Sequence, residues 1–171
     1  MKALRISALL TALLLAGPAQ AQNNWSSPGN ACVPSGESIA AAAHKTSVTS
    51  IRFATGAVGQ IELVCPIPRF NSATPSYKLK LTYEDSTGKG TTASVTAQLY
   101  RMANTTTEAV LLGSASSNSS AASTANTVSS STINHTFDFE ANIYWVRVLI
   151  KRGATNETAI FHSVILDGTA L

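Results

Sequence analysis

The sequence predicts an all-β protein, a single-domain antiparallel β-sandwich of the jelly-roll or immunoglobulin-like kind with about eight strands and one disulfide. Three observations favour this fold class. Apolar and polar side chains alternate along several segments, which is the pattern of half-buried strands. Turn residues separate these segments at intervals typical of sandwiches and barrels. Helical periodicity is nearly absent, which excludes a parallel α/β sheet because its crossovers need long helices.

The amino-terminal end has the pattern of a cleavable secretory signal peptide over residues 1–21. Two basic residues precede an apolar run at 9–16, and the small-x-small tripeptide at 19–21 provides a cleavage site. This run is too short to span a bilayer and no later segment approaches ~20 apolar residues, so we expect no membrane span. We therefore predict one domain over 22–171, which a bacterium exports to the periplasm or to the extracellular space.

The number and distribution of charged residues argue against nucleic acid as a partner. Of the 12 lysine and arginine residues, two lie in the predicted signal, which leaves 10 basic against 9 acidic residues. No basic stripe interleaved with aromatic residues occurs, although a nucleic-acid groove requires one. Nucleic acid is therefore not an expected partner.

Cys32 and Cys65 are the only cysteines. An even number of cysteines in an exported chain favours a disulfide, so we predict that these two are joined. No C-x-x-C motif occurs and neither cysteine has a histidine at ligand spacing, so we expect no metal and no other cofactor.

Alternation marks the main strands one by one along the chain. Odd-numbered apolar residues predict strands at 51–53 and 61–65, and the second ends at prolines, which cannot donate to a ladder. The clearest pattern covers 77–84, and a turn-forming DSTGKG segment then leads to a strand at 92–102, so we expect a hairpin. The carboxyl-terminal third predicts strands at 133–139, 144–150 and 159–167.

Two segments resist this pattern. Residues 38–45 (SIAAAAHK) suit either a short helix or an irregular strand. Residues 113–125 (GSASSNSSAASTA) contain too few apolar side chains to offset the entropy of ordering them, so we predict a flexible loop.

His135 and His162 fall on strand faces that are otherwise apolar. If their strands are neighbours, the two imidazoles could form a buried polar pair, and with Asp138 or Asp167 a metal site or an acid–base pair. The alternative, which we favour, is that each is a core histidine whose ring N–H reaches a backbone carbonyl.

No catalytic centre is predicted. Serine is abundant, but no G-x-S-x-G nucleophile elbow occurs. Asp138 and Glu140 come nearest to the carboxylate pair of a glycosidase, yet they share the expected solvent face of one strand, where charges ordinarily serve solubility. We therefore expect that the protein is not an enzyme.

Trp145, Arg147 and Trp25 are the candidate binding residues. Trp145 is opposite in phase to the apolar residues on either side of it, which places it on an outer face beside Arg147. An exposed indole there could stack on a sugar face. For both tryptophans the alternative, which we favour, is a packing role, and Trp25 precedes a segment that the disulfide would tether to the sheet.

These features favour an exported, non-catalytic binding module for a glycan or another cell-envelope component. The alternative is a structural subunit of a surface assembly. The size, the export signal and the early cysteine pair are similar in outline to chaperone–usher pilin subunits, which exchange strands between neighbours. The predicted mature amino terminus lacks the alternating apolar arm that such a subunit donates. A hydrolase of unrecognised type is a third alternative.

Overall fold

The computed structural model describes residues 24–35, 43–45, 49–70, 76–120 and 124–168, and the predicted signal at 1–21 lies outside them. The described elements, in chain order, are β1 (Trp25–Pro28), η1 (Gly29–Ala31), β2 (Val33–Pro34), β3 (Ala43–Lys45), β4 (Ile51–Phe53), β5 (Gly59–Pro66), β6 (Ser76–Asp85), β7 (Ala93–Ala103), β8 (Ala109–Ser116), η2 (Ser117–Ser119), β9 (Asn126–Ser129), β10 (Ile133–Asn134), β11 (Asn142–Arg152) and β12 (Ala159–Gly168). Several are edge strands of two to four residues, too short for alternation to reveal, which is why about eight strands were expected.

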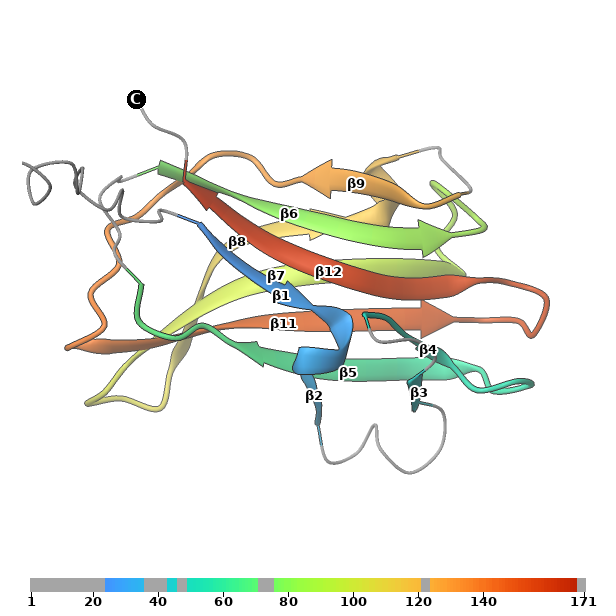
Figure 1. Cartoon of the computed structure of the whole chain (residues 1–171), viewed down its shortest axis with the longest axis horizontal. Helices are drawn as coiled ribbons and strands as arrows, with labels where there is room; N and C mark the ends of the chain where they lie inside the picture. The colour runs from blue at the N-terminus through green and yellow to red at the C-terminus, as the bar shows by residue number, and fades with distance from the viewer. Residues whose placement is uncertain (1–23, 36–42, 46–48, 71–75, 121–123, 169–171) are drawn as a thin grey trace, which may run out of the picture.

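The strands form two antiparallel sheets that lie one behind the other in Figure 1. The seven-stranded sheet has the order β10-β6-β12-β4-β3, with β1 paired to β12 and β9 paired to β6. The five-stranded sheet has the order β2-β5-β11-β7-β8. The predicted antiparallel β-sandwich is therefore confirmed.

The core lies between the sheets and is built from every second residue of each long strand. Its fully buried members include Ile61, Leu63, Leu79, Leu81, Val95, Leu99, Val146, Val148, Ile150, Phe161, Val164 and Leu166. The side chains between them in sequence point to the outer faces, as the pleat of a strand requires. A ligand can therefore reach only the residues that alternate with the core positions along each strand.

The predicted disulfide between Cys32 and Cys65 is present. Cys32 directly precedes β2, which pairs with β5 in the five-stranded sheet, and Cys65 lies in β5 next to the paired residue Val64. Both residues are buried. The bond therefore fastens the chain just before the edge strand β2 to β5 of the same sheet.

The predicted hairpin of residues 77–84 and 92–102 is wrong. These segments form β6 and β7, which belong to different sheets. β6 pairs with β12 on one side and with β9 and β10 on the other, so no edge is left for β7. Alternation predicted which face of each strand is buried, but a cross-sheet connection gives the same pattern as a hairpin.

A buried carboxylate explains how the chain crosses between the layers after β6. Asp85 is fully buried and accepts hydrogen bonds from the Thr87 amide at 2.9 Å and from the Thr87 hydroxyl at 3.0 Å. It also accepts one at 2.6 Å from the hydroxyl of Ser117, which follows β8 of the other sheet. This one side chain therefore connects both sheets at this end of the sandwich.

The prediction of a flexible loop at 113–125 is wrong for the first half of this segment. Residues 109–116 form β8, and Ser117–Ser119 form a 3-10 turn. Ser117 is fully buried and accepts a hydrogen bond from the Val95 amide at 3.0 Å, besides donating to Asp85. Hydrogen bonds from serine thus order a segment that composition marks as flexible. Residues 121–123 lie outside the described part.

Within the ambiguous stretch at 38–45, residues Ala43–Lys45 form β3 and pair with β4, while 38–42 lie outside the described residues. No helix in the described ranges is long and apolar enough to cross a membrane.

Candidate functional site

The outer face of the five-stranded sheet carries the candidate site. Trp145 lies in β11, the middle strand of this sheet, between Pro66 of β5 and Tyr100 of β7. Both neighbouring core residues of Trp145 in β11 are buried, whereas Trp145 itself is partly exposed. The outer-face position predicted for Trp145 therefore agrees with the register of the strands.

Trp145 and Tyr100 form a stacked aromatic pair. Their ring centroids are 5.6 Å apart and their planes differ by 15°. They occupy directly opposed positions of β11 and β7, where cross-strand side chains come close enough to interact. Because each ring supports the other, the pair is held in one orientation while it stays partly exposed.

A polar row lies next to this pair on the same face. Arg147 donates from Nη2 to Oε2 of Glu62 at 2.6 Å, and their side chains are 35% and 25% exposed. Tyr100 donates its hydroxyl to Oε1 of Gln98 at 3.4 Å. The hydrogen bond to Glu62 raises the pKa of Arg147 above its ordinary, already high value, so its guanidinium stays charged. Nε of Arg147 is buried without a hydrogen-bond partner in the described part of the chain.

This arrangement suits non-covalent binding of a ligand with an apolar face and a polar perimeter. The aromatic pair offers π surface, and the Arg147, Glu62 and Gln98 side chains offer donors and acceptors at its margin. We call the five residues Glu62, Gln98, Tyr100, Trp145 and Arg147 the aromatic face.

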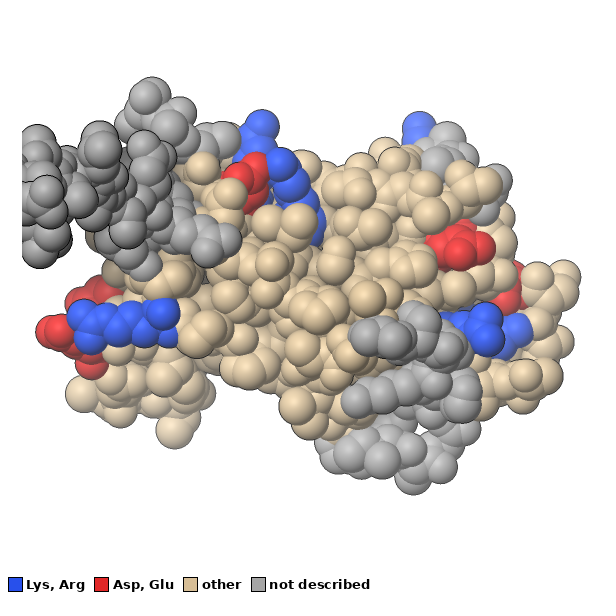
Figure 2. Space-filling model, viewed as in Figure 1, with Lys and Arg blue, Asp and Glu red and all other residues tan. Residues whose placement is uncertain are grey.

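The outer face of the seven-stranded sheet differs in character. Figure 2 shows it largely uncharged, with charged side chains gathered toward its margins. Lys80 and Asp167 form an ion pair there. Among the described strands, none of the residues that point outward on this face is Phe, Tyr or Trp. The stacked pair therefore distinguishes the face of the five-stranded sheet.

A concavity of about 380 Å³ lies elsewhere, between the loop after β4 and the loop before β12. Arg152 forms one of its walls, and its guanidinium donates to the carbonyls of Ala54, Ala57, Ala154 and Thr155. This cation is therefore engaged in holding two loops together rather than presented to a ligand.

The structure places Trp25 in the core. Its side chain is 9% exposed, and β1 pairs with β12 of the seven-stranded sheet. It contributes no ring face to the aromatic face, which lies on the other sheet, and we do not include it in the site.

The two histidines do not form a pair. His162 lies in β12 at a β-bulge, and its Nε2 is buried without a hydrogen-bond partner among the described residues. His135 follows β10, which is aligned through Tyr77 with Gly168 at the far end of β12. Gly168 is six residues beyond His162, or about 20 Å at the rise of a strand. The register thus separates the two imidazoles along the sheet.

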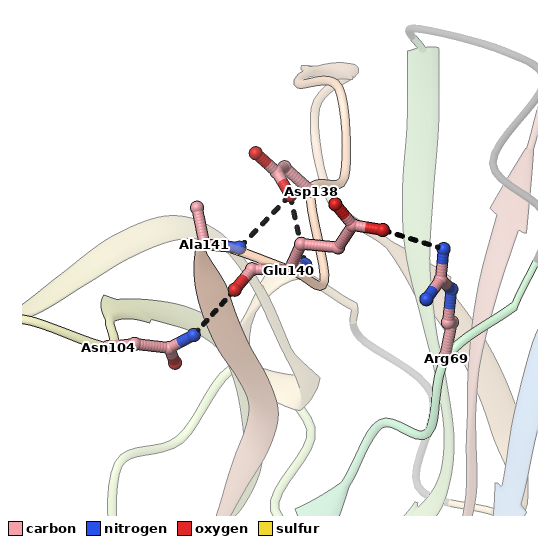
Figure 3. A network of polar contacts seen from close by, with 5 residues as sticks. All are labelled: Arg69, Asn104, Asp138, Glu140 and Ala141. Atoms are coloured by element: carbon pink, nitrogen blue, oxygen red, sulfur yellow. Dashed lines mark hydrogen bonds and ion pairs between the residues drawn. The ribbon is translucent and has the colours of Figure 1, made fainter.

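Residues 135–141 form an irregular segment that ends in a turn at 139–141, rather than the predicted strand, because polar side chains hold this segment. Oδ1 of Asp138 accepts from the amides of Glu140 and Ala141 at 3.0 and 3.1 Å (Figure 3). Glu140 pairs with Arg69 at 3.4 Å, and its backbone carbonyl accepts from Asn104 at 2.8 Å. The two carboxylates considered for a glycosidase therefore serve this turn.

His135 is hydrogen-bonded within this end of the sandwich. Its Nε2 is 3.1 Å from the hydroxyl of Tyr144, which also accepts from the Asp138 amide at 3.1 Å. Burial raises the pKa of Tyr144, so its hydroxyl keeps its proton. Tyr144 can then donate to Nε2, which requires His135 to be neutral.

This geometry predicts a pH dependence of stability. Burial and, secondly, the charge of Arg101 hold the pKa of His135 below its ordinary value of 6.5. The unfolded chain therefore binds a proton more readily, and the free energy of unfolding should fall as the pH drops from above 6.5 to below the folded pKa, then level off. Urea titrations between about pH 7.5 and pH 5 should show this slope in the wild type and a smaller slope in His135→Gln. Equal slopes would contradict the assignment.

Sequence reasoning missed Tyr100, Glu62 and Gln98. A signal was available, because each is out of phase with the core residues of its own strand. Only the register shows that these residues adjoin Trp145 and Arg147, since β5, β11 and β7 are far apart in the chain. Among the described residues, no group of three or more His, Cys, Asp or Glu side chains could hold a metal ion.

Comparison with known proteins gives similarity at the level of overall structure only. No family model matches the chain, and no curated protein matches it. One similar solved structure is the CBM36-1 domain of a multidomain xylanase from the hindgut metagenome of Trinervitermes trinervoides, with TM-score 0.44, 9% identity, and coverage of 87% of this chain and 100% of that one. The xylan-binding module CBM15 has TM-score 0.42, 16% identity, and coverage of 75% and 84%.

A third similar structure is the family 11 carbohydrate-binding module from Clostridium thermocellum, in complex with a β-1,3-1,4-mixed-linked tetrasaccharide. It has TM-score 0.41 and 11% identity, and the match covers 86% of this chain and 90% of that one. At such scores and identities the similarity supports no statement about function.

Proposed function

We propose that this protein is an exported, non-catalytic module that binds a glycan on the aromatic face. The observation that carries the proposal is the stacked Trp145–Tyr100 pair, partly exposed and bordered by the Arg147–Glu62 ion pair. A sugar ring has an apolar face of C–H groups and a perimeter of hydroxyl groups. An aromatic ring beside fixed donors and acceptors satisfies both features.

Rigidity strengthens this argument. The aromatic pair is stacked, Arg147 is fixed on Glu62, and all five residues project from three hydrogen-bonded strands. A preorganised surface loses little conformational entropy on binding, so more of the contact energy appears as affinity.

We propose that the protein binds the glycan without cleaving it. Glu62 is engaged by Arg147, and Asp138 and Glu140 serve the turn before β11. We therefore expect a bound oligosaccharide to be recovered intact after prolonged incubation. Appearance of shortened products, lost on substitution of Glu62, would favour the hydrolase alternative.

Strand exchange between subunits has less support. β1, the first described strand, already pairs along β12 within the same chain. The edge of β12 is completed by β4, and that of β6 by β9 and β10. The formed disulfide suits an oxidising compartment, and with the signal expected at 1–21 we place the module in the periplasm or outside the cell.

Affinity electrophoresis in gels that contain a soluble polysaccharide tests the proposal. A panel of xylan, mixed-linkage β-glucan, galactomannan and an acidic pectin should include one that slows the wild-type protein. Trp145→Ala and Tyr100→Ala should each weaken binding at least about tenfold, because loss of an aromatic stacking platform typically costs more than 1 kcal/mol.

Leu149→Ala is the matched control for these variants. Leu149 is a partly exposed apolar residue of the same strand and face, four positions from Trp145. It should retain wild-type mobility shifts, and all three variants should keep melting temperatures close to that of the wild type. Unchanged retention of Trp145→Ala, or no retardation of the wild type by any glycan in the panel and on a glycan array, would refute the proposal.

A further inference from the structure

The aromatic pair is the centre of a longer apolar row that crosses the strands. On the outer face, Trp145 is directly opposed to Pro66 of β5, and Tyr100 is directly opposed to Leu111 of β8. Pro66 is exposed, and Leu111 is 48% exposed. The row Pro66–Trp145–Tyr100–Leu111 therefore runs at right angles to four adjacent strands.

The row reaches beyond the strand pairing of the sheet at both ends. β8 is the last strand of its sheet, so no described strand lies beyond Leu111. On the other side β2 covers only Val64 and Leu63 of β5 and stops short of Pro66. No further strand therefore pairs beyond either end of the row.

The two flanks of the row differ. On one flank, Arg147 and Gln98 are directly opposed to each other, and Arg147 is paired with Glu62. On the other flank, Ile143, which is 49% exposed, is directly opposed to Met102. The flank with hydrogen-bonding groups holds one cation and one anion that are paired with each other, so the charges that border the row compensate each other.

We infer that the row binds an internal segment of a linear, neutral, β-linked polysaccharide, with the sugar chain crossing the strands and leaving the surface at both ends. This inference rests on the proposed function and names its substrate class. Neighbouring strands are ~4.8 Å apart, which is close to the repeat of an extended β-linked pyranose chain. Successive sugar rings can therefore lie over successive side chains of the row, with their hydroxyls toward Arg147 and Gln98.

Calorimetric titration with ladders of cello- and xylo-oligosaccharides, from disaccharide to hexasaccharide, tests the inference. Affinity for one ladder should rise at least about tenfold from disaccharide to tetrasaccharide and then level off, because rings beyond the row make no contact. Reduction of the chain end of the hexasaccharide to an alditol should leave its affinity unchanged, because an internal segment is bound.

Leu111→Ala and its matched control locate the effect. Leu111→Ala should weaken tetrasaccharide binding several-fold and leave disaccharide binding unchanged, since the disaccharide is held by the central rings. Val110→Ala should change neither, because Val110 is similarly exposed on the same strand but points to the opposite side. Exposed positions such as these are not expected to impair folding.

These experiments distinguish failure of the inferred polysaccharide class from failure of glycan binding itself. Glycan binding that is independent of chain length, that requires a free chain end, or that is stronger for acidic than for neutral saccharides would overturn the inference and leave glycan binding in place. Failure of the wild type to bind any glycan in gels, on arrays and in titrations would overturn both.

Discussion

Replacing Asp85 by alanine is expected to lower the free energy of unfolding by about 3 kcal/mol. The carboxylate is fully buried and accepts hydrogen bonds from two groups of Thr87 and from the hydroxyl of Ser117. Its removal leaves the hydroxyl of the fully buried Ser117 and the Thr87 amide without this acceptor, whereas the Thr87 hydroxyl keeps the Ala93 carbonyl. The penalty for a buried donor without a partner exceeds the modest net value of a satisfied hydrogen bond. Urea denaturation should show a lower midpoint with an unchanged slope.

Glu84→Ala is the matched control for Asp85→Ala. Glu84 precedes Asp85 in β6, points to the outer face and is partly exposed, so its loss should change stability by less than about 0.5 kcal/mol. If Asp85→Ala were as stable as Glu84→Ala, the carboxylate would not be the link between the two sheets.

Removal of the disulfide should have an effect of similar size. The bond joins cysteines 33 positions apart, and constraint of an unfolded loop of that length is worth roughly 3 to 4 kcal/mol. The double variant Cys32→Ala/Cys65→Ala should lose this amount in urea denaturation, and the wild type treated with a reducing agent should behave alike. A loss below about 1 kcal/mol in both would show that packing and strand pairing alone hold the segment at β2 against β5.

Much of the fold follows from the sequence because alternation reports burial directly. Ile61, Leu63 and Cys65 were expected to point inward and do so, and the outward phase of Trp145 was equally readable. Partners of strands could not be predicted in this way. The hairpin failed because β6 and β7 bury alternate residues whether they pair with each other or face each other across the core.

Hydrogen bonding explains the other departures. Ser117 is ordered by Asp85 and Val95, and Asp138 converts an alternating segment into a turn. Neither effect is visible in composition, because each depends on a partner distant in the chain or on a local side-chain acceptor. For the candidate site, the outward phase of Trp145 and Arg147 along their strand was enough to predict them. Tyr100 and Glu62 could be assigned to the site only from the register of three strands.

An NMR titration would locate the binding surface residue by residue. Isotope-labelled wild-type protein would be titrated with the oligosaccharide that binds most tightly, and backbone amide and indole shifts would be followed. We predict that the largest changes fall on the Trp145 indole and on outer-face positions of β5, β11, β7 and β8. Changes confined to the concavity beside Arg152, or to the face of the seven-stranded sheet, would contradict binding on the aromatic face.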